Sequence, residues 1–365
     1  MVIRLSILLF LFCSIQSTAQ YRSVGLHLIG GGLIKHRNFI TIDYSKPSFG
    51  FEFNYEQKAD GSKNWHKACR YPRWGVSYLF LHFGNKEELG WAMGLVPYVN
   101  IDFLNKERFR LYGTFGVGLA VVSAPFDRIS NPRNNVIGSY INNNTRFELG
   151  LDIHLNSQFS LRNTITFTHY SNAASQLPNL GINVLSGRFG LMYHISAKQK
   201  VSEVPSTVES DKRVHFSFHS SFGFREISTT NGPKFPMLQV NVQSGLFITS
   251  NQLLQAGLEY DYQGAVYEFM RNNGGFAPSE LMARASRVSF VLSDEVFIGR
   301  FSMQFQAGVY LTRNDYQPWF MHFRLTAKYY LRNIFDKGIK PYLLVAIKAH
   351  KIVAEYYSVG FGFTI

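Results

Sequence analysis

The sequence predicts an all-β protein that forms an antiparallel β-barrel in the bacterial outer membrane. Apolar and polar residues alternate along most of the chain, as in Phe147, Leu149 and Leu151 against Glu148 and Gly150, and a period of two indicates strands with one apolar face. The runs last about 10 to 15 residues, as tilted membrane strands require, whereas soluble strands average about 5 to 6. Aromatic residues make up 16% of the chain, which favours a membrane barrel with aromatic girdles over a soluble sandwich.

The N-terminus has the pattern of a secretory signal peptide. After Arg4, residues 5–15 form an apolar run, and the small residues Ser17, Thr18 and Ala19 follow where a signal peptidase reads. The run is too short for a membrane-spanning helix, which needs about 20 residues. We therefore expect cleavage after Ala19 and a mature protein in the outer membrane of a Gram-negative bacterium.

The alternating runs form two sets separated by a polar stretch that contains Pro205 and is typical of a linker. The first set lies near 22–33, 46–57, 72–83, 89–104, 107–123, 145–155, 158–170 and 184–196, and the second near 214–226, 235–249, 252–268, 282–297, 300–312, 319–333, 340–350 and 353–365. The predicted parts are a signal peptide (1–19), a first barrel (20–198), a linker (199–213) and a second barrel half (214–365).

Two architectures accommodate these runs: two tandem eight-stranded barrels, or one barrel of about sixteen strands. Each set ends in an alternating aromatic segment, at 189–195 and 357–365, that resembles the closing strand of an outer-membrane protein. This repetition favours two barrels. The larger barrel would enclose an aqueous channel, so it keeps open a non-enzymatic function as a porin or structural protein.

Connection lengths indicate which barrel end faces outward. The short connections at 156–157 and 250–251 are typical of periplasmic turns, and the longer ones at 124–144 and 172–182 are typical of external loops. The long connection at 58–71 falls on the periplasmic side and does not fit this scheme.

The net charge of +13 indicates either an anionic partner or simply scattered, solvated lysines. A secreted chain rarely meets nucleic acid, so the phosphates of outer-leaflet lipids are the expected partner.

Removal of the signal leaves Cys69 as the only cysteine, which excludes an internal disulfide. Together with His66 it offers too few ligands for a metal site, and no metal site is predicted.

Three polar residues stand where an apolar, lipid-facing surface is expected. His169 and Ser171 are two residues apart at a strand end and share the parity of Ile165 and Phe167, so all four point to one face. In the next strand, Asn183 has the parity of the lipid-facing positions. Unpaired polar groups are costly on that surface.

These residue types match the parts of a serine ester hydrolase. A serine hydroxyl becomes nucleophilic when a histidine takes its proton, and a carboxylate or amide must orient the histidine. Ser171, His169 and Asn183 can fill these roles. Spacing alone leaves open the alternative that they are rim residues hydrogen-bonded to water and lipid headgroups.

The segment His169-Tyr170-Ser171-Asn172, followed by Pro178-Asn179 and Gly181, resembles the active-site motif of the outer-membrane lipid A deacylase, or acyloxyacyl hydrolase-like, family. The resemblance covers the first half of the chain. It implies a small barrel whose exterior site removes an acyl chain from lipid A, with His169 as base and Ser171 as nucleophile.

The same resemblance implies that Asn172, Asn179 and the backbone at Ala174, where the family has glycine, stabilise the oxyanion. No cofactor is implied. The sequence departs from the family at Asn183, where the family has glutamate. A histidine, serine and asparagine in this order are also similar to the outer-membrane phospholipase A family, which keeps phospholipid as an alternative substrate and calcium as an open cofactor.

The second half offers no matching site. His350 lies near the start of the last hairpin, but no serine follows two residues later. Its parity with Leu344 and Ala346 points it toward the lumen, so a structural role is expected.

Overall fold

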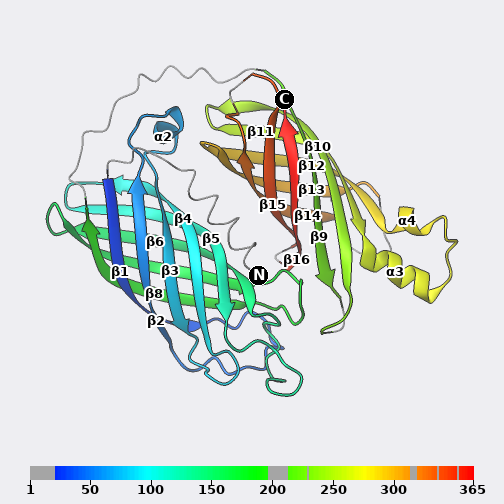
Figure 1. Ribbon diagram of the computed structural model, residues 1–365, viewed down its shortest axis with the longest axis horizontal. Coiled ribbons are helices and arrows are strands. Elements are labelled where there is room, and N and C mark those ends of the chain that lie inside the picture. The colour runs from blue at the N-terminus through cyan, green and yellow to red at the C-terminus, as the bar shows by residue number, and fades with distance from the viewer. Residues whose placement is uncertain (1–20, 196–212, 228–229, 313–318, 335–336, 352) are drawn as a thin grey trace.

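The computed structural model describes residues 21–195, 213–227, 230–312, 319–334, 337–351 and 353–365, and these form two closed antiparallel barrels (Figure 1). The first barrel comprises β1 (Tyr21–Leu33), β2 (Ser48–Lys58), β3 (Arg73–His82), β4 (Trp91–Asn105), β5 (Phe109–Val122), β6 (Ile141–His154), β7 (Phe159–Ser171) and β8 (Ile182–His194). The second comprises β9 (His215–Glu226), β10 (Lys234–Thr249), β11 (Gln252–Gln263), β12 (Ser286–Ile298), β13 (Phe301–Tyr310), β14 (Met321–Tyr330), β15 (Lys340–His350) and β16 (Val353–Thr364).

Each barrel closes on itself. β8 pairs with β1, with Tyr193 opposite Val24, and β16 pairs with β9, with Val359 opposite Phe222. The prediction of two eight-stranded barrels is therefore confirmed, and the alternative of one sixteen-stranded barrel is wrong. The expected signal peptide and nearly all of the expected linker lie outside the described residues.

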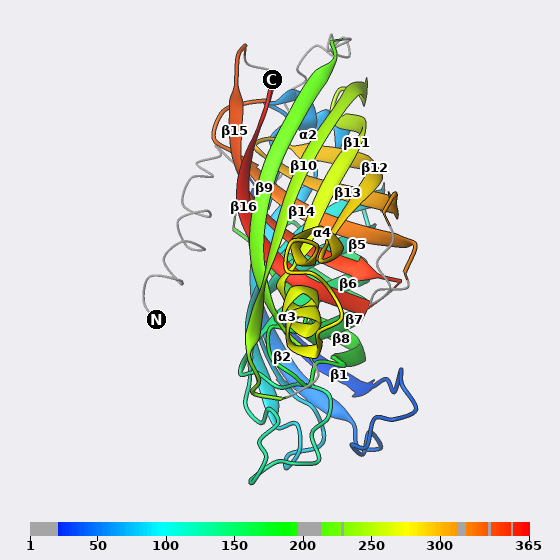
Figure 2. The same ribbon diagram turned by 90° about the vertical axis from the view of Figure 1, so that its right-hand side faces the viewer.

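One predicted strand was too long at its C-terminal end. The run expected over 252–268 leaves the barrel after Gln263, where α3 (Gly264–Asn273) begins, and α4 (Leu281–Arg284) follows in the same connection. Val266 and Met270 are four residues apart and pack together with Leu281 in a small apolar cluster, as a helical period allows. Figures 1 and 2 show both helices outside the barrel wall. In the described part of the chain, no helix is long and apolar enough to cross a membrane.

The long connection at 58–71 contains a short helix, α2 (Asn64–Ala68), between correctly predicted strands. His66 anchors it, since its Nδ1 lies 3.1 Å from Asp60 Oδ1 and accepts a hydrogen bond from the Gly61 N–H. The connection is therefore a folded insertion. It lies at the barrel end where most connections are short turns, and this end is here called the turn end. The opposite end, with the connections at 34–47, 83–90, 123–140 and 172–181, is called the loop end.

Paired charges fill both barrel interiors. In the first barrel, the guanidinium of Arg162 binds both Asp152 and Glu56. In the second, Glu259 accepts from Lys348 Nζ at 3.2 Å, and Lys328 Nζ lies 2.7 Å from Glu295. All are buried, as expected of eight-stranded barrels, whose interiors are occupied by side chains. This packing argues against the porin alternative.

The loop end of the first barrel contains an apolar cluster that supports β7 and β8 from inside. Tyr170 and Ile182, on these two strands, pack with Phe83, Val136 and Ile137. The rings of Phe83 and Tyr170 meet edge to face with centroids 5.4 Å apart. Dense packing of this kind holds the ends of β7 and β8 in place, and these ends carry the candidate site.

His350 faces the interior of the second barrel, as its parity predicted. Its Nε2 lies 2.8 Å from the Tyr310 hydroxyl, and its Nδ1 lies 3.2 Å from Glu355. Both contacts are structural.

Candidate active site

The pairing of β7 with β8 brings His169 and Asn183 directly opposite each other. Both lie on the outward face of the wall. Along the same strands Ile165 is 64% exposed, whereas Thr166 and Val184, of the other parity, are buried. The β-strand alternation thus places two polar side chains side by side on the barrel exterior.

The two side chains are hydrogen-bonded. His169 Nδ1 lies 2.5 Å from Asn183 Oδ1. An amide oxygen can only accept, so the imidazole carries its proton on Nδ1 and donates it to Asn183. This tautomer leaves a lone pair on Nε2, the form that a general base requires.

Gly181 lets the backbone pass close to the His169 ring. A Cβ at this position would lie 2.5 Å from His169 Cε1, and the backbone has a φ of +85° that favours glycine. The Gly181 N–H donates to the Val136 carbonyl at 2.9 Å, so the inner loop holds this turn in place. The imidazole is therefore confined between Asn183 and Gly181.

Ser171 is the last residue of β7 and shares the outward parity of His169. Its hydroxyl forms no hydrogen bond with His169 or with any other described side chain. The expectation that Ser171 is open at the lipid-facing rim is wrong, because its side chain is only 2% exposed. The Tyr357 hydroxyl of β16 interacts with the Ser171 hydroxyl without reaching hydrogen-bond geometry.

The loop after Ser171 is held by Asn172. Its N–H donates to Asn179 Oδ1 at 2.8 Å, and its Nδ2 donates to Ser139 Oγ at 2.7 Å and to the Gln176 carbonyl at 2.9 Å. The structure thus brings Asn172 and Asn179 together. These bonds occupy the donors of Asn172, however, so in this conformation they fix the loop and do not face a substrate.

Ala174 lies in a sharp turn of the same loop. Ala173 and Ala174 have φ values of 45° and 57°, the left-handed region that is unfavourable for residues with a Cβ. The Ala174 carbonyl accepts from the Glu226 N–H of β9 at 2.8 Å. The turn is therefore held by the second barrel as well as by its own loop.

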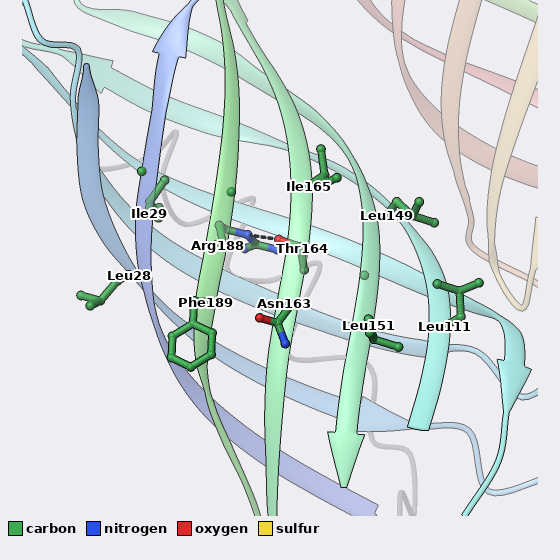
Figure 3. A pocket seen from close by; sticks show the side chains of 13 residues that line it. Leu28, Ile29, Leu111, Leu149, Leu151, Asn163, Thr164, Ile165, Arg188 and Phe189 are labelled. Atoms are coloured by element: carbon green, nitrogen blue, oxygen red, sulfur yellow. Dashed lines mark hydrogen bonds between the residues drawn. The ribbon is translucent and has the colours of Figure 1, made fainter. Parts of the chain in front are cut away.

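A mainly apolar groove of about 650 Å³, whose lining also includes Asn163, Thr164 and Arg188, lies on the outer wall farther along the same strands. Figure 3 shows Leu28, Ile165 and Phe189 projecting from the wall around it. Gly30 and Gly187 are opposite each other in the strand register, and a Cβ on Gly30 would meet nothing within 4 Å. The groove begins about 13 Å from the histidine, given four residues at about 3.3 Å each.

Two features of this site were not predicted from the sequence. The packing of Gly181 on the His169 ring was missed, although a glycine between two strands signals a close backbone approach. The contacts of Tyr357 and Glu226 were missed because they depend on how the two barrels pack, and no local pattern encodes that packing.

In the described residues, no group of three or more His, Cys, Asp or Glu side chains is arranged to hold a metal ion.

Two protein families match the chain. The family described as lipid A 3-O-deacylase (PagL) matches residues 49–192, which include the whole candidate site. The family described as acyloxyacyl hydrolase, C-terminal domain, matches residues 214–365, the second barrel. A comparison with curated proteins found no match.

Among solved structures, the outer membrane enzyme PagL is 17% identical, with 46% of this chain and 97% of that chain covered and a TM-score of 0.32. CdiB from Acinetobacter baumannii is 9% identical, with 95% and 60% covered and a TM-score of 0.20. A triple mutant of the Rhodopseudomonas blastica porin is 8% identical, with 94% and 100% covered and a TM-score of 0.18. These likenesses are too weak to support a functional argument.

The two family matches follow one another along the chain and coincide with the two barrels. They agree with the resemblance carried by the segment 169–181, and they place the protein in the outer membrane. The first barrel therefore belongs to the lipid A 3-O-deacylase (PagL) family, and the second is an acyloxyacyl hydrolase C-terminal domain.

Proposed function

We propose that this protein is a carboxylic ester hydrolase that removes an ester-linked acyl chain from lipid A by a Ser171-His169-Asn183 mechanism. The observation that carries the proposal is the His169–Asn183 hydrogen bond on the outer wall, with Ser171 two residues away on the same face. Family membership supports the hydrolase class and a lipid A substrate.

The chemistry follows from the histidine tautomer. Nε2 of His169 takes the proton of the Ser171 hydroxyl as Oγ attacks the ester carbonyl carbon, and the carbonyl oxygen becomes an oxyanion. Collapse of this intermediate breaks the bond to the lipid alkoxide, which receives the proton from His169. Water then attacks the acyl-serine with His169 again as base, which releases the fatty acid and restores Ser171. Rotation of the Ser171 side chain toward Nε2 completes the pair, since catalytic hydrogen bonds are often open without substrate.

The groove beside Leu28, Ile165 and Phe189 is suited to the acyl chain. It is mainly apolar, it opens on the lipid-facing wall, and it lies along the same strands as His169 and Asn183. A lipid can therefore place its headgroup ester near the end of β7 while its hydrocarbon stays in an apolar environment. Because Ser171 is only 2% exposed, the side chains that cover it must move aside for the attack. No passage through the barrel interior is needed.

Incubation of the purified full-length protein with lipid A in detergent micelles tests this function. We expect free fatty acid and a lipid A that has lost one acyl chain by mass spectrometry, with phospholipid unchanged in a parallel incubation. Chelation by EDTA should leave the rate unchanged, since the triad needs no metal. Acyl loss from phospholipid instead would support the phospholipase A-like alternative, and loss from neither would support a non-enzymatic barrel.

Substitution of Asn183 tests the role of the orienting group. Asn183→Ala removes the acceptor at His169 Nδ1, and we expect kcat to fall by about 10- to 100-fold, less than for loss of the nucleophile. Asn183→Glu should raise kcat above wild type, because a carboxylate stabilises the imidazolium that forms during attack. Steady-state kinetics on lipid A micelles measures both effects. Wild-type activity in Asn183→Ala would show that Asn183 does not contribute to catalysis.

A further inference from the structure

The second barrel contacts the active-site loop of the first. Glu226, at the end of β9, donates its N–H to the Ala174 carbonyl at 2.8 Å and accepts the Leu177 N–H with its carboxylate. Its side chain is 1% exposed. Burial of a carboxylate is costly unless hydrogen bonds stabilise it. The Glu226 carboxylate is therefore a specific contact between β9 and the loop 172–181.

Other contacts hold the two barrels together at both ends. At the loop end, Gln176 Nε2 donates to Asn231 Oδ1 at 3.2 Å, near the Glu226 contact. At the turn end, Asn251 Nδ2 donates to Cys69 Sγ at 3.3 Å, and the Trp65 ring packs against Gly299. Contacts at both ends give the barrels the same up-and-down orientation, as one membrane requires, and fix which wall of the second barrel faces Ser171.

Tyr357 projects from that wall. Along β16, Val359 and Phe361 are exposed on the outer face, whereas Tyr356 and Ser358 point into the lumen. Tyr357 has the outward parity, yet it is only partly exposed, and its hydroxyl interacts with the Ser171 hydroxyl. A tyrosine of the second barrel thus reaches the nucleophile of the first.

A hydrogen-bond donor at this place would serve the reaction. Attack by Ser171 turns the ester carbonyl oxygen into an oxyanion next to Oγ, and donors fixed there supply the largest single contribution to catalysis in many enzymes. Asn172, the side chain expected to serve, already gives its N–H to Asn179 and its amide to Ser139 and Gln176. A phenol hydroxyl is a suitable donor, and tyrosine is among the side chains that form oxyanion holes.

We propose that the second barrel completes the active site of the first: Tyr357 donates a hydrogen bond to the oxyanion formed at Ser171, and Glu226 positions the loop that carries Ala174. This inference rests on the proposed function and explains why a barrel without its own site accompanies the first. Tyr357 is accordingly a catalytic residue, and Glu226 is a positioning residue that acts through the 172–181 loop.

Tyr357→Phe in the full-length protein tests the catalytic part, with a micellar p-nitrophenyl ester and lipid A as substrates. Phenylalanine keeps the aromatic ring and removes only the hydroxyl donor. We expect kcat to fall by about 100-fold with KM within about twofold, as for loss of one oxyanion donor. Tyr193→Phe, on the outer wall of β8 far from Ser171, is the matched control and should retain wild-type kinetics.

Glu226 variants test the positioning part. Glu226→Ala removes the acceptor of the Leu177 N–H, and we expect kcat to fall by at least about tenfold as the turn at Ala174 shifts. Glu226→Gln keeps an acceptor oxygen and should restore most of the lost activity. A merely stabilising contact would lower the unfolding temperature without a selective loss of kcat or a rescue by glutamine.

The outcomes separate this inference from the proposed function. If Ser171→Ala is inactive and Tyr357→Phe keeps or exceeds wild-type kcat, the hydrolase stands and the donor role of Tyr357 is wrong. If Ser171→Ala keeps full activity, the proposed function itself is wrong. A selective loss of kcat in Tyr357→Phe, with an unchanged control and a normally folded barrel, supports the inference.

Discussion

Ser171→Ala and His169→Ala are each expected to lower kcat on lipid A by at least about 1,000-fold. The first substitution removes the nucleophile and the second removes its base. The double variant should be little worse than either single variant, because the two groups act as one unit in the same step. Steady-state release of fatty acid measures all three variants against wild type.

Ser175→Ala is the matched control for these variants. Ser175 lies in the same loop, and the bond through which it holds the turn is made by its backbone N–H to the Asn172 carbonyl, so alanine preserves it. We expect wild-type kinetics from this variant. All four proteins should show the heat-modifiable gel migration of a folded outer-membrane barrel. Activity retained in Ser171→Ala would show that another group performs the attack.

Gly181→Ala is expected to lower kcat by about 100-fold or more while the barrel still folds. The added methyl carbon would lie 2.5 Å from His169 Cε1, so the imidazole must move away from its position beside Asn183. A displacement of about 1 Å at a catalytic group can cost about 100-fold in rate. Kinetics and thermal unfolding of the same preparations separate the effect on the site from the effect on stability.

Gly338→Ala is the control for backbone strain. Gly338 has the same φ of +85°, but a Cβ there would meet nothing within 4 Å. Both alanine variants should lose similar stability, about 1 kcal/mol from the left-handed conformation, and only Gly181→Ala should lose activity. Equal activity in the two variants would contradict the confinement of His169 by Gly181.

Most of the fold was predictable because a barrel strand is defined by local alternation. The outward row of β7, with Ile165 and Phe167, and the inward row, with Thr164 and Thr166, follow directly from a period of two. The same rule placed His169 and Asn183 on the exterior. The start of α3 after Gln263 was missed, because the apolar residues of so short a segment fit a strand period and a helix period equally well.

The environment of the site was less predictable, because it depends on contacts between distant segments. Ser171 interacts with Tyr357 of β16, which lies 186 positions later in the chain. The engagement of the Asn172 donors requires Ser139 from another loop. The sequence alone does not explain why the chain has a second barrel. The contacts of Glu226 with Ala174 and Leu177 indicate that the second barrel supports the active-site loop of the first.

The most direct test of the central claim is the lipid composition of cells that express the wild-type protein or Ser171→Ala at equal levels in the outer membrane. Mass spectrometry of extracted lipid A and phospholipids compares the two strains. The proposed mechanism predicts lipid A that lacks one ester-linked acyl chain in the wild-type strain only, with a matching release of fatty acid. Identical profiles, with no acyl chain lost from lipid A in either strain, would contradict it.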